Sequence, residues 1–205
     1  MIPASLLLHA YRNAIFPMAM QDGEIGWFSP NPRAIIPIDD GFHIPHGLRR
    51  TLRKGLFEIH LNVDFEEVMR RCGQRDETWI NEEIVESYVN LHRLGHAHSV
   101  EAWQGERLVG GLYGVALGRV FFGESMFARE PDASKIAFVH LVRRLSAWGF
   151  ALIDCQQDTD HLRRFGARCI ARADFLAIVR SNVQLAGPAS PWLYDGGASE
   201  SWATR

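Results

Sequence analysis

The middle of the chain shows two hydrophobic periods, one typical of helices and one typical of strands. Apolar residues recur at helical spacing across residues 81–94, and Gly95 ends this run. The pattern then changes to alternation at residues 97–103. Two similar stretches follow at 107–116 and 119–122, each after a short Gly-containing turn. Three strands joined by tight turns predict an antiparallel meander.

Helical and strand patterns continue on both sides of this meander. Gly149 ends a helical run that begins at Asp132 or Ser134, two residue types that cap helices. The remaining predicted elements are a helix at residues 4–14, a strand at 151–154, and helices at 158–165 and 172–179. This order predicts an α+β fold with a mixed, mainly antiparallel sheet. It resembles the acyl-CoA N-acyltransferase (GNAT) fold, although a fold alone does not determine function.

The composition changes at both ends of the chain. Residues 1–41 contain five prolines, which predict turns and extended segments around one short helix. We therefore expect a small N-terminal domain at residues 1–41 and a GNAT-like main domain at 42–205. A Gly-, Ser- and Ala-rich stretch from about residue 187 predicts a loose C-terminal tail.

Composition and charge restrict the class of protein. Hydrophobic residues make up 47% of the 205 residues and charged residues 22%, as in an ordinary globular protein. Because the formal charge is −2, an anionic partner must be held by a local patch. The three cysteines lack Cys-x-x-Cys spacing, which argues against disulfides or structural zinc and favours a cytoplasmic protein. No apolar run reaches the ~18 residues of a membrane span, no signal peptide is recognisable, and nothing demands more than a monomer.

A short basic segment at residues 45–55 gives the clearest physical signal. Leu48 and Leu52 have the positions of core anchors, and the cations share another face at positions i, i+3, i+4 and i+7. These cations are His46, Arg49, Arg50 and Arg53, with Lys54 beside them. Such a group can bind about two or three phosphates, although a solvated surface face has the same pattern. We expect modest, salt-sensitive binding of RNA phosphates.

Two strand ends carry carboxylates that are candidates for catalysis. Glu124 follows Gly123, which leaves room for a ligand beside the backbone. Asp154 ends another predicted strand, a common catalytic placement in open sheets, and alternation puts Gln156 on the same side. Either carboxylate could instead cap a helix, and Glu124 could form a salt bridge. Cys155 points to the opposite side, where we expect buried packing rather than a nucleophile.

Aromatic and apolar residues supply candidates for a binding pocket. Trp79 is either a stacking platform for a nucleotide base or a core side chain. Phe138, Leu141 and Leu145 form one stripe on the predicted helix after residue 132. A stripe of this kind is typical of core packing, and it also suits the wall of a pocket for a large apolar side chain.

Eight short motifs follow one another along the chain from Leu7 to Val179. They are AYRNAIFPM at 10–18, WFSPNPR at 27–33, ETWI at 77–80, LGHAHSV at 94–100, GGLYGVA at 110–116, GESMF at 123–127, ASK at 133–135 and IDCQ at 153–156. Their order resembles that of the bacterial leucyl/phenylalanyl-tRNA–protein transferase family, and chance does not place so many motifs in one order.

The resemblance implies an aminoacyltransferase with a GNAT-like C-terminal domain and a small N-terminal domain. It implies that Leu-tRNA and Phe-tRNA, and Met-tRNA more weakly, donate an amino acid to proteins with N-terminal Arg or Lys. The bacterial N-end rule protease then degrades these proteins. Aminolysis of an activated ester requires no metal and no cofactor. Asp154 is expected to orient Gln156, which positions the attacking amine and accepts its proton through a relay.

The resemblance also assigns roles to single positions. Asp154, Gln156 and Glu124 are expected to be catalytic. The matching binding positions are Trp79, Phe28, Ser125 and Met126 for the aminoacyl-adenosine; Leu112, Phe121, Phe138, Leu141, Leu145 and Ile153 for the amino acid side chain; and Arg49, Arg50, Arg53 and Lys54 for tRNA phosphates.

Some positions depart from the family's pattern. The family usually has two tryptophans where this chain has Trp27 and Phe28, which weakens the expected base stacking. Two aromatic pocket positions are Leu141 and Leu145 here, which shifts the expected preference between Leu and Phe donors. A frequent asparagine is Thr159, so that position has no assigned role.

Three alternative functions stay open at this point. The same chemistry could act on N-terminal Asp or Glu, because the acceptor preference is not visible in the sequence. An acyl-CoA-dependent N-acetyltransferase would need a pyrophosphate-binding loop, which residues 128–132 do not supply. A non-catalytic RNA-binding protein could use the basic segment, but the net charge is too low for indiscriminate RNA binding.

Overall fold

The computed structural model of the chain describes residues 1–38, 41–187 and 192. Most of the tail predicted to be loose, from about residue 187, lies outside these residues. Trp192 is described, and it is buried in a hydrophobic core. None of the described helices is long and apolar enough to cross a membrane.

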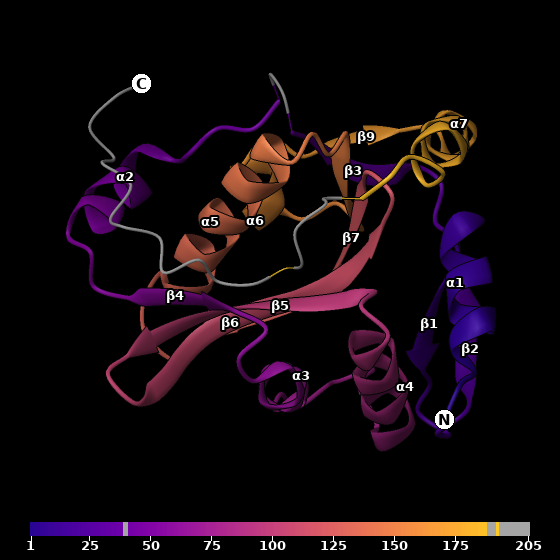
Figure 1. Cartoon of the computed structure of the whole chain (residues 1–205), viewed down its shortest axis with the longest axis horizontal. Coiled ribbons are helices and arrows are strands. Elements are labelled where there is room, and N and C mark those ends of the chain that lie inside the picture. The colour runs from indigo at the N-terminus through magenta and orange to yellow at the C-terminus, as the bar shows by residue number, and fades with distance from the viewer. Residues whose placement is uncertain (39–40, 188–191, 193–205) are drawn as a thin grey trace.

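Seven strands form one mixed sheet in the order β4-β5-β6-β7-β8-β3-β9 (Figure 1). Only the β7–β8 pair is parallel among the described strand pairs, so the predicted α+β class with a mainly antiparallel sheet is confirmed. The strands are β3 (Arg33–Pro37), β4 (Glu58–Leu61), β5 (Ala97–Gln104), β6 (Arg107–Leu117), β7 (Val120–Ala128), β8 (Leu152–Gln156) and β9 (Arg168–Ile170).

The predicted meander is formed by β5, β6 and β7, but its third strand is longer than predicted. β7 continues to Ala128 and remains paired with β6 up to the Gly110–Ala128 pair, through a register shift after Tyr113. The prediction stopped at residue 122 because Gly123 and Glu124 have low strand propensity. Glu124 therefore lies within a strand and not after one.

Helices cover both faces of this sheet, and each face has its own hydrophobic core. In Figure 1, α3 and α4 lie below the sheet, and α5 and α6 lie above it. One layer contains α1 (Ala4–Arg12), α3 (Phe65–Gly73), α4 (Glu82–Arg93) and α7 (Arg172–Asn182), and the other contains α2 (His46–Arg53), α5 (Ala133–Ala147) and α6 (Asp160–Arg163).

Side-chain caps explain where three of the described helices begin. The Asn81 side chain accepts a hydrogen bond from the Ile84 amide at 2.9 Å, which caps α4. Asp64 caps α3 in the same way, although α3 was not among the predicted elements. The helix predicted at 158–165 is shorter, because Thr159 caps it and α6 ends at Arg163.

The N-terminal region forms more strand than its prolines suggested. β1 (Phe16–Ala19) and β2 (Ile25–Phe28) form a separate two-stranded sheet, in which Pro17 is tolerated. β3 instead pairs with β8 and β9 in the large sheet. The predicted boundary after residue 41 assigned β3 to the small domain, whereas its pairing assigns it to the large sheet.

The parallel strands β7 and β8 pair over a short distance only. Their register joins three residue pairs and ends with Phe122 and Asp154. Both strands continue beyond this point, β7 to Ala128 and β8 to Gln156. Glu124 and Gln156 therefore lie where the two strands no longer pair. A Cβ at Gly123 would be 3.3 Å from the carbonyl oxygen of Asp154, so glycine there also permits the close approach of β8.

Candidate active site

A cavity of about 310 Å³ lies where β7 and β8 stop pairing. It brings together most of the side chains predicted to act at one site, from strands, helices and loops. The predicted residues in its lining are Glu124, Asp154 and Gln156; Trp79, Ser125 and Met126; and Leu112, Phe121, Phe138, Leu141 and Ile153.

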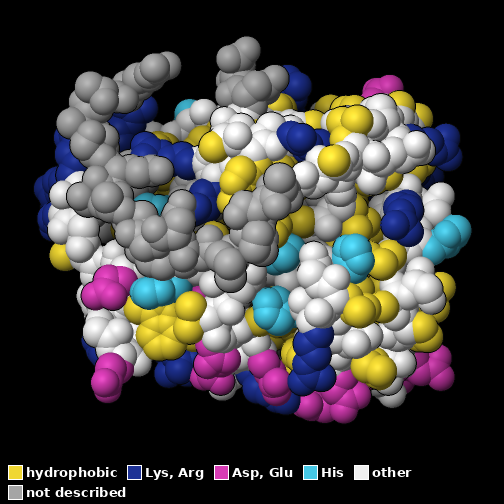
Figure 2. Space-filling model, in the orientation of Figure 1, with side chains coloured by type: hydrophobic (Ala, Val, Ile, Leu, Met, Phe, Trp, Pro, Cys, Tyr) yellow, Lys and Arg dark blue, Asp and Glu magenta, His cyan; other side chains and the backbone are white. Residues whose placement is uncertain are grey.

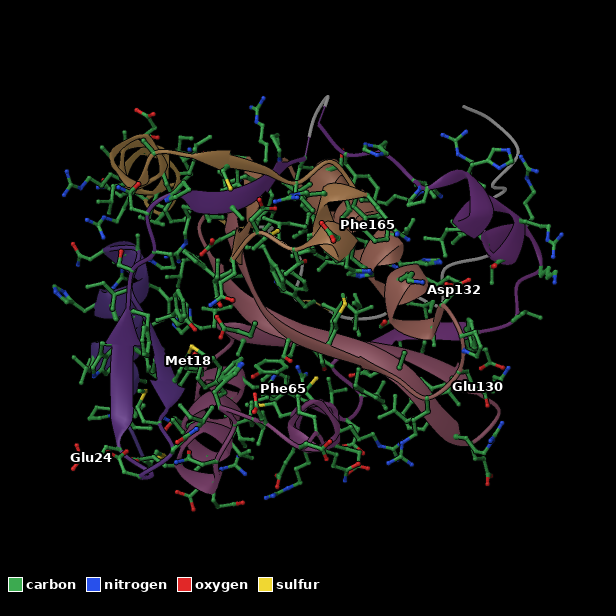
Figure 3. The ribbon with its side chains drawn as sticks, turned by 180° about the vertical axis from the view of Figure 1, so that it is seen from behind. Met18, Glu24, Phe65, Glu130, Asp132 and Phe165 are labelled. Carbon is green, nitrogen blue, oxygen red and sulfur yellow. The ribbon has the colours of Figure 1, made fainter. Side chains whose placement is uncertain are left out.

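Two of the residues predicted to bind the aminoacyl-adenosine or the amino acid side chain do not line this cavity. Leu145 is fully buried in the core beneath α5, because it lies seven residues, or about 10 Å along a helix, beyond Phe138. Phe28 of β2 stacks on Phe16 at 6.2 Å between ring centroids, within the N-terminal region. From that region it is Met18 of β1 that reaches the cavity lining. Figure 3 labels Met18 beside the sheet.

The centre of the site is a buried ion pair between Arg33 of β3 and Asp154 of β8. Arg33 donates from Nε to Oδ1 at 2.8 Å and from Nη2 to Oδ2 at 2.7 Å, and both side chains are 0% exposed. Its Nη1 donates to the Ala14 carbonyl at 3.0 Å. The guanidinium also lies 4.9 Å from the ring centroids of both Phe16 and Phe175. Burying two charges requires this full set of partners.

Asp154 also fixes the backbone of Gln156. Asp154 Oδ1 accepts a hydrogen bond from the Gln156 amide nitrogen at 2.9 Å. Gln156 has φ 61°, in the left-handed region that is costly for a residue with a Cβ. This conformation lets the Gln156 side chain donate from Nε2 to Glu124 Oε1 at 2.9 Å, across the gap between β8 and β7.

Two tyrosine hydroxyls also donate hydrogen bonds to Glu124. Tyr11 of α1 donates to Oε1 at 2.7 Å, Tyr88 of α4 lies 3.4 Å from Oε2, and the two hydroxyls are hydrogen-bonded to each other. Burial is the main cause that raises the pKa of Glu124, the Tyr11 hydrogen bond opposes it and the Asp154 charge adds to it, and the resulting pKa is about 8. The site therefore holds a carboxyl group whose protonation changes near neutral pH.

Other lining residues were missed by the sequence analysis. Arg75 donates from Nη2 to the Ser125 hydroxyl at 2.8 Å and to the Met126 carbonyl at 3.3 Å, so it fixes the cavity rim on β7. Thr159 lines the cavity and caps α6 by accepting from Leu162, which gives that position a structural role. A basic residue in a loop gives no periodic signal, and only the fold places Arg75 here.

The cavity-lining cysteine has no feature of a nucleophile. Burial raises the pKa of Cys155, and the Asp154 charge raises it further, so the thiol stays protonated at neutral pH. Its side chain packs against the hydrophobic core on the α5 side of the sheet. Among the described residues, no group of three or more His, Cys, Asp or Glu side chains is arranged to hold a metal ion.

The predicted basic segment forms α2 as expected. Leu48 and Leu52 are buried, whereas Arg49, Arg50 and Arg53 are exposed. Figure 2 shows Lys and Arg side chains gathered on the left, over α2. α2 supplies no side chain to the lining of the cavity, so any role in RNA binding must act at a distance from the reacting atoms.

Comparisons with known proteins identify one family. A sequence profile described as "Leucyl/phenylalanyl-tRNA protein transferase" matches residues 35–180, and one for the N-terminal domain of the same family matches residues 1–31. Among solved structures, that of L-PGS from Bacillus licheniformis has a TM-score of 0.45 and 10% identity over 76% of this chain and 66% of that chain, too weak a likeness to assign the fold.

Curated relatives with the name leucyl/phenylalanyl-tRNA–protein transferase match most of the chain. The protein from Rubrobacter xylanophilus is 52% identical over 83% of this chain and 90% of its own length. That from Herpetosiphon aurantiacus is 51% identical over 87% and 93%, and that from Thiobacillus denitrificans is 49% identical over 92% and 84%. The chain therefore belongs to the leucyl/phenylalanyl-tRNA–protein transferase family of aminoacyltransferases.

Proposed function

We propose that this enzyme transfers Leu or Phe, and Met more weakly, from charged tRNA to the N-terminal α-amine of proteins that begin with Arg or Lys. Proteins modified in this way become substrates of N-end rule degradation. The proposal depends on one observation: the same cavity contains an apolar pocket and the hydrogen-bonded Glu124–Gln156–Asp154 group. An esterified amino acid and an incoming amine need such a junction.

The apolar part of the cavity suits the side chain of the donor amino acid. Leu112, Phe121, Phe138, Leu141 and Ile153 line it, and they expose no polar side-chain group to that part. Because an apolar pocket separates aliphatic side chains by only ~1–3 kcal/mol, donor selectivity is graded. We assign the terminal adenosine to the part of the cavity that the Trp79, Ser125 and Met126 side chains line.

The chemistry is the aminolysis of an ester. The acceptor nitrogen forms a bond with the ester carbonyl carbon, the bond from this carbon to the ribose oxygen breaks, and one proton passes from nitrogen to that oxygen. An acceptor that arrives as an ammonium group loses one more proton to the enzyme. Alignment of the two substrates in one cavity accounts for much of the acceleration, up to ~7 kcal/mol or more.

The hydrogen bonds of Asp154 favour a revised proton path. Both carboxylate oxygens are already occupied by Arg33, and Oδ1 also accepts from the Gln156 amide. Asp154 is thus a positioning residue that holds Gln156. We assign proton acceptance to Glu124, because its raised pKa brings its titration close to that of an α-amine, ~7.7–8.0.

We also propose that the sheet is of the GNAT type and that the enzyme works as a cytoplasmic monomer. The parallel strands β7 and β8, which lose their pairing at the cavity, support the first assignment. The three cysteines, Cys72, Cys155 and Cys169, are free thiols, which suits a reducing compartment.

The test of acceptor choice uses labelled Leu-tRNA and four peptides that differ only in an N-terminal Arg, Lys, Asp or Glu. We expect label in the Arg and Lys peptides and none in the other two. Label in the Asp or Glu peptide would replace this acceptor assignment by the alternative one. A parallel reaction with acetyl-CoA is expected to give no product, and acetylation would revive the N-acetyltransferase alternative.

A further inference from the structure

A second cavity of about 830 Å³ lies between α2, the start of α5 and α6. We call it the α2–α6 groove. Its lining includes Arg50 of α2, Lys135 of α5, and Arg164 directly after α6. Asp132 and Phe165, which also line the groove, are labelled in Figure 3.

The groove adjoins the reactive cavity through one side chain. His161 lines both cavities, so they share a wall. Its Nε2 is buried and has no hydrogen-bond partner among the residues that the structure describes. A buried polar atom without a partner costs free energy, which a ligand at this junction could recover. His161 thus marks where a chain lying in the groove would enter the reactive cavity.

The groove has an excess of cations that are available to a ligand. Its two carboxylates are already engaged: Asp132 accepts from Thr51 at 3.2 Å and from Lys135 at 2.7 Å, and Asp160 pairs with Arg163 at 3.3 Å. The Lys135 ammonium keeps two further donors, and Arg164 is exposed. Burial lowers the pKa of His161, and the charges of Lys135 and Arg164 lower it further. Both cations therefore lie near the side chain that the two cavities share.

We propose that the α2–α6 groove binds the phosphates of the unpaired 3′ strand of the donor RNA, with Lys135 and Arg164 as phosphate ligands. This inference rests on the proposed function, because only a charged RNA has such a strand ending at the esterified adenosine. Arg50 lines the groove, whereas Arg49 and Arg53 do not. We assign Arg49 and Arg53 to phosphates of the paired acceptor stem.

This division of contacts explains how a protein with a formal charge of −2 can hold a polyanion. The basic helix α2 and the groove together form one local cationic track. Single-strand phosphate contacts release counterions, so each one adds about −0.7 to the slope of log affinity against log salt.

The test compares two forms of one tRNA, the full-length RNA and the same RNA without its unpaired 3′ nucleotides. Arg164→Gln and Lys135→Gln are expected to weaken binding of the full-length tRNA about tenfold each and to leave the truncated tRNA unaffected. Arg49→Gln and Arg53→Gln are expected to weaken the binding of both forms. Arg180→Gln, an equal charge change in α7 on the other face of the sheet, is the matched control.

Turnover gives a second readout. In Leu-tRNA transfer, the two groove variants are expected to raise KM for the RNA and to leave kcat and KM for the acceptor peptide unchanged. Unchanged affinity for full-length tRNA, an equal loss with truncated tRNA, or a change in KM for the peptide instead would each overturn the proposal. Binding does not require transfer, so tRNA binding by an enzyme without transfer would contradict the proposed function and leave the groove assignment intact.

Discussion

The guanidinium of Arg33 holds both carboxylate oxygens of Asp154, at 2.8 and 2.7 Å, and neither side chain is exposed. The two residues are 121 positions apart, on the neighbouring strands β3 and β8. The pair therefore ties the N-terminal part of the chain to the strand that carries Gln156. Because the pair occupies both carboxylate oxygens of Asp154, the function of Asp154 is to position other groups.

The first prediction concerns this ion pair. Asp154→Asn leaves the buried guanidinium of Arg33 without its counter-charge, which is expected to cost about 3–5 kcal/mol in the free energy of unfolding. The combined change of Arg33→Met with Asp154→Leu is expected to recover much of that loss and to remain inactive. Urea unfolding of the three proteins checks this. Wild-type stability for Asp154→Asn would show that the pair is not buried as described.

The second prediction is a dependence of stability on pH. The folded protein keeps the proton of Glu124 up to a pKa of about 8, whereas the unfolded chain loses it near 4.5. Between these two pH values the folded state binds one proton more than the unfolded state. The protonated Glu124 therefore contributes stability that is fully present below pH 4.5 and is lost as the pH rises through 8. Glu124→Gln removes the titration, so its stability relative to wild type should increase from pH 5 to pH 9.

Urea unfolding at fixed pH values measures that difference. A difference that stays constant from pH 5 to pH 9 would mean that Glu124 titrates normally. Tyr11→Phe is a useful companion variant, because it removes the hydroxyl at 2.7 Å that lowers the pKa of Glu124. The midpoint of the pH effect should then move to higher pH.

The third prediction uses two leucines one turn apart on α5. Both Leu141 and Leu145 are fully buried, but only Leu141 lines the cavity. Leu141→Ala enlarges the pocket and is expected to favour Phe over Leu as donor by about tenfold. Leu145→Ala is expected to cost ~2–5 kcal/mol of stability and to leave the donor ratio unchanged. Competition between Leu-tRNA and Phe-tRNA checks the ratio, and equal shifts in both variants would refute the pocket assignment.

The fourth prediction separates the backbone of Gln156 from its side chain. Gln156 has φ 61°, which glycine adopts without strain. Gln156→Gly therefore removes the side-chain amide and the strain, whereas Gln156→Ala removes the side-chain amide and keeps the strained backbone. We expect Gly to be more stable than Ala at this position by about 1 kcal/mol. Both variants should lose transfer activity equally, since neither can donate to Glu124. An active Gly variant would show that the side chain is dispensable.

Sequence periodicity predicted the elements that have strong local signals. The helical pattern of α4 and the alternation of β5 and β6 depend on neighbouring residues, and the structure has these elements nearly as predicted. The position of β3 between β8 and β9 depends instead on pairing with residues more than a hundred positions away. The prolines of the N-terminal region indicated turns, and that local signal concealed a strand of the main sheet.

The site shows the same division between local and long-range information. The motif with Glu124 and the motif with Asp154 and Gln156 identified the central polar side chains, and the structure brings them into contact. Their partners Arg33 and Tyr11 lay within other motifs of the resemblance but had no assigned role. Those contacts join β3 to β8 and α1 to β7, and no spacing along the chain encodes them. The misassigned Leu145 followed from a helix stripe that is longer than the cavity.

The most direct measurement is the mass of an acceptor peptide with N-terminal Arg after incubation with Leu-tRNA. With wild-type enzyme we expect the peptide to gain one leucine residue at its α-amine. With Glu124→Gln we expect no gain while the tRNA still binds. A peptide of unchanged mass with the wild-type enzyme, for Leu-tRNA and Phe-tRNA alike, would contradict the proposal that this cavity joins an esterified amino acid to a protein amine.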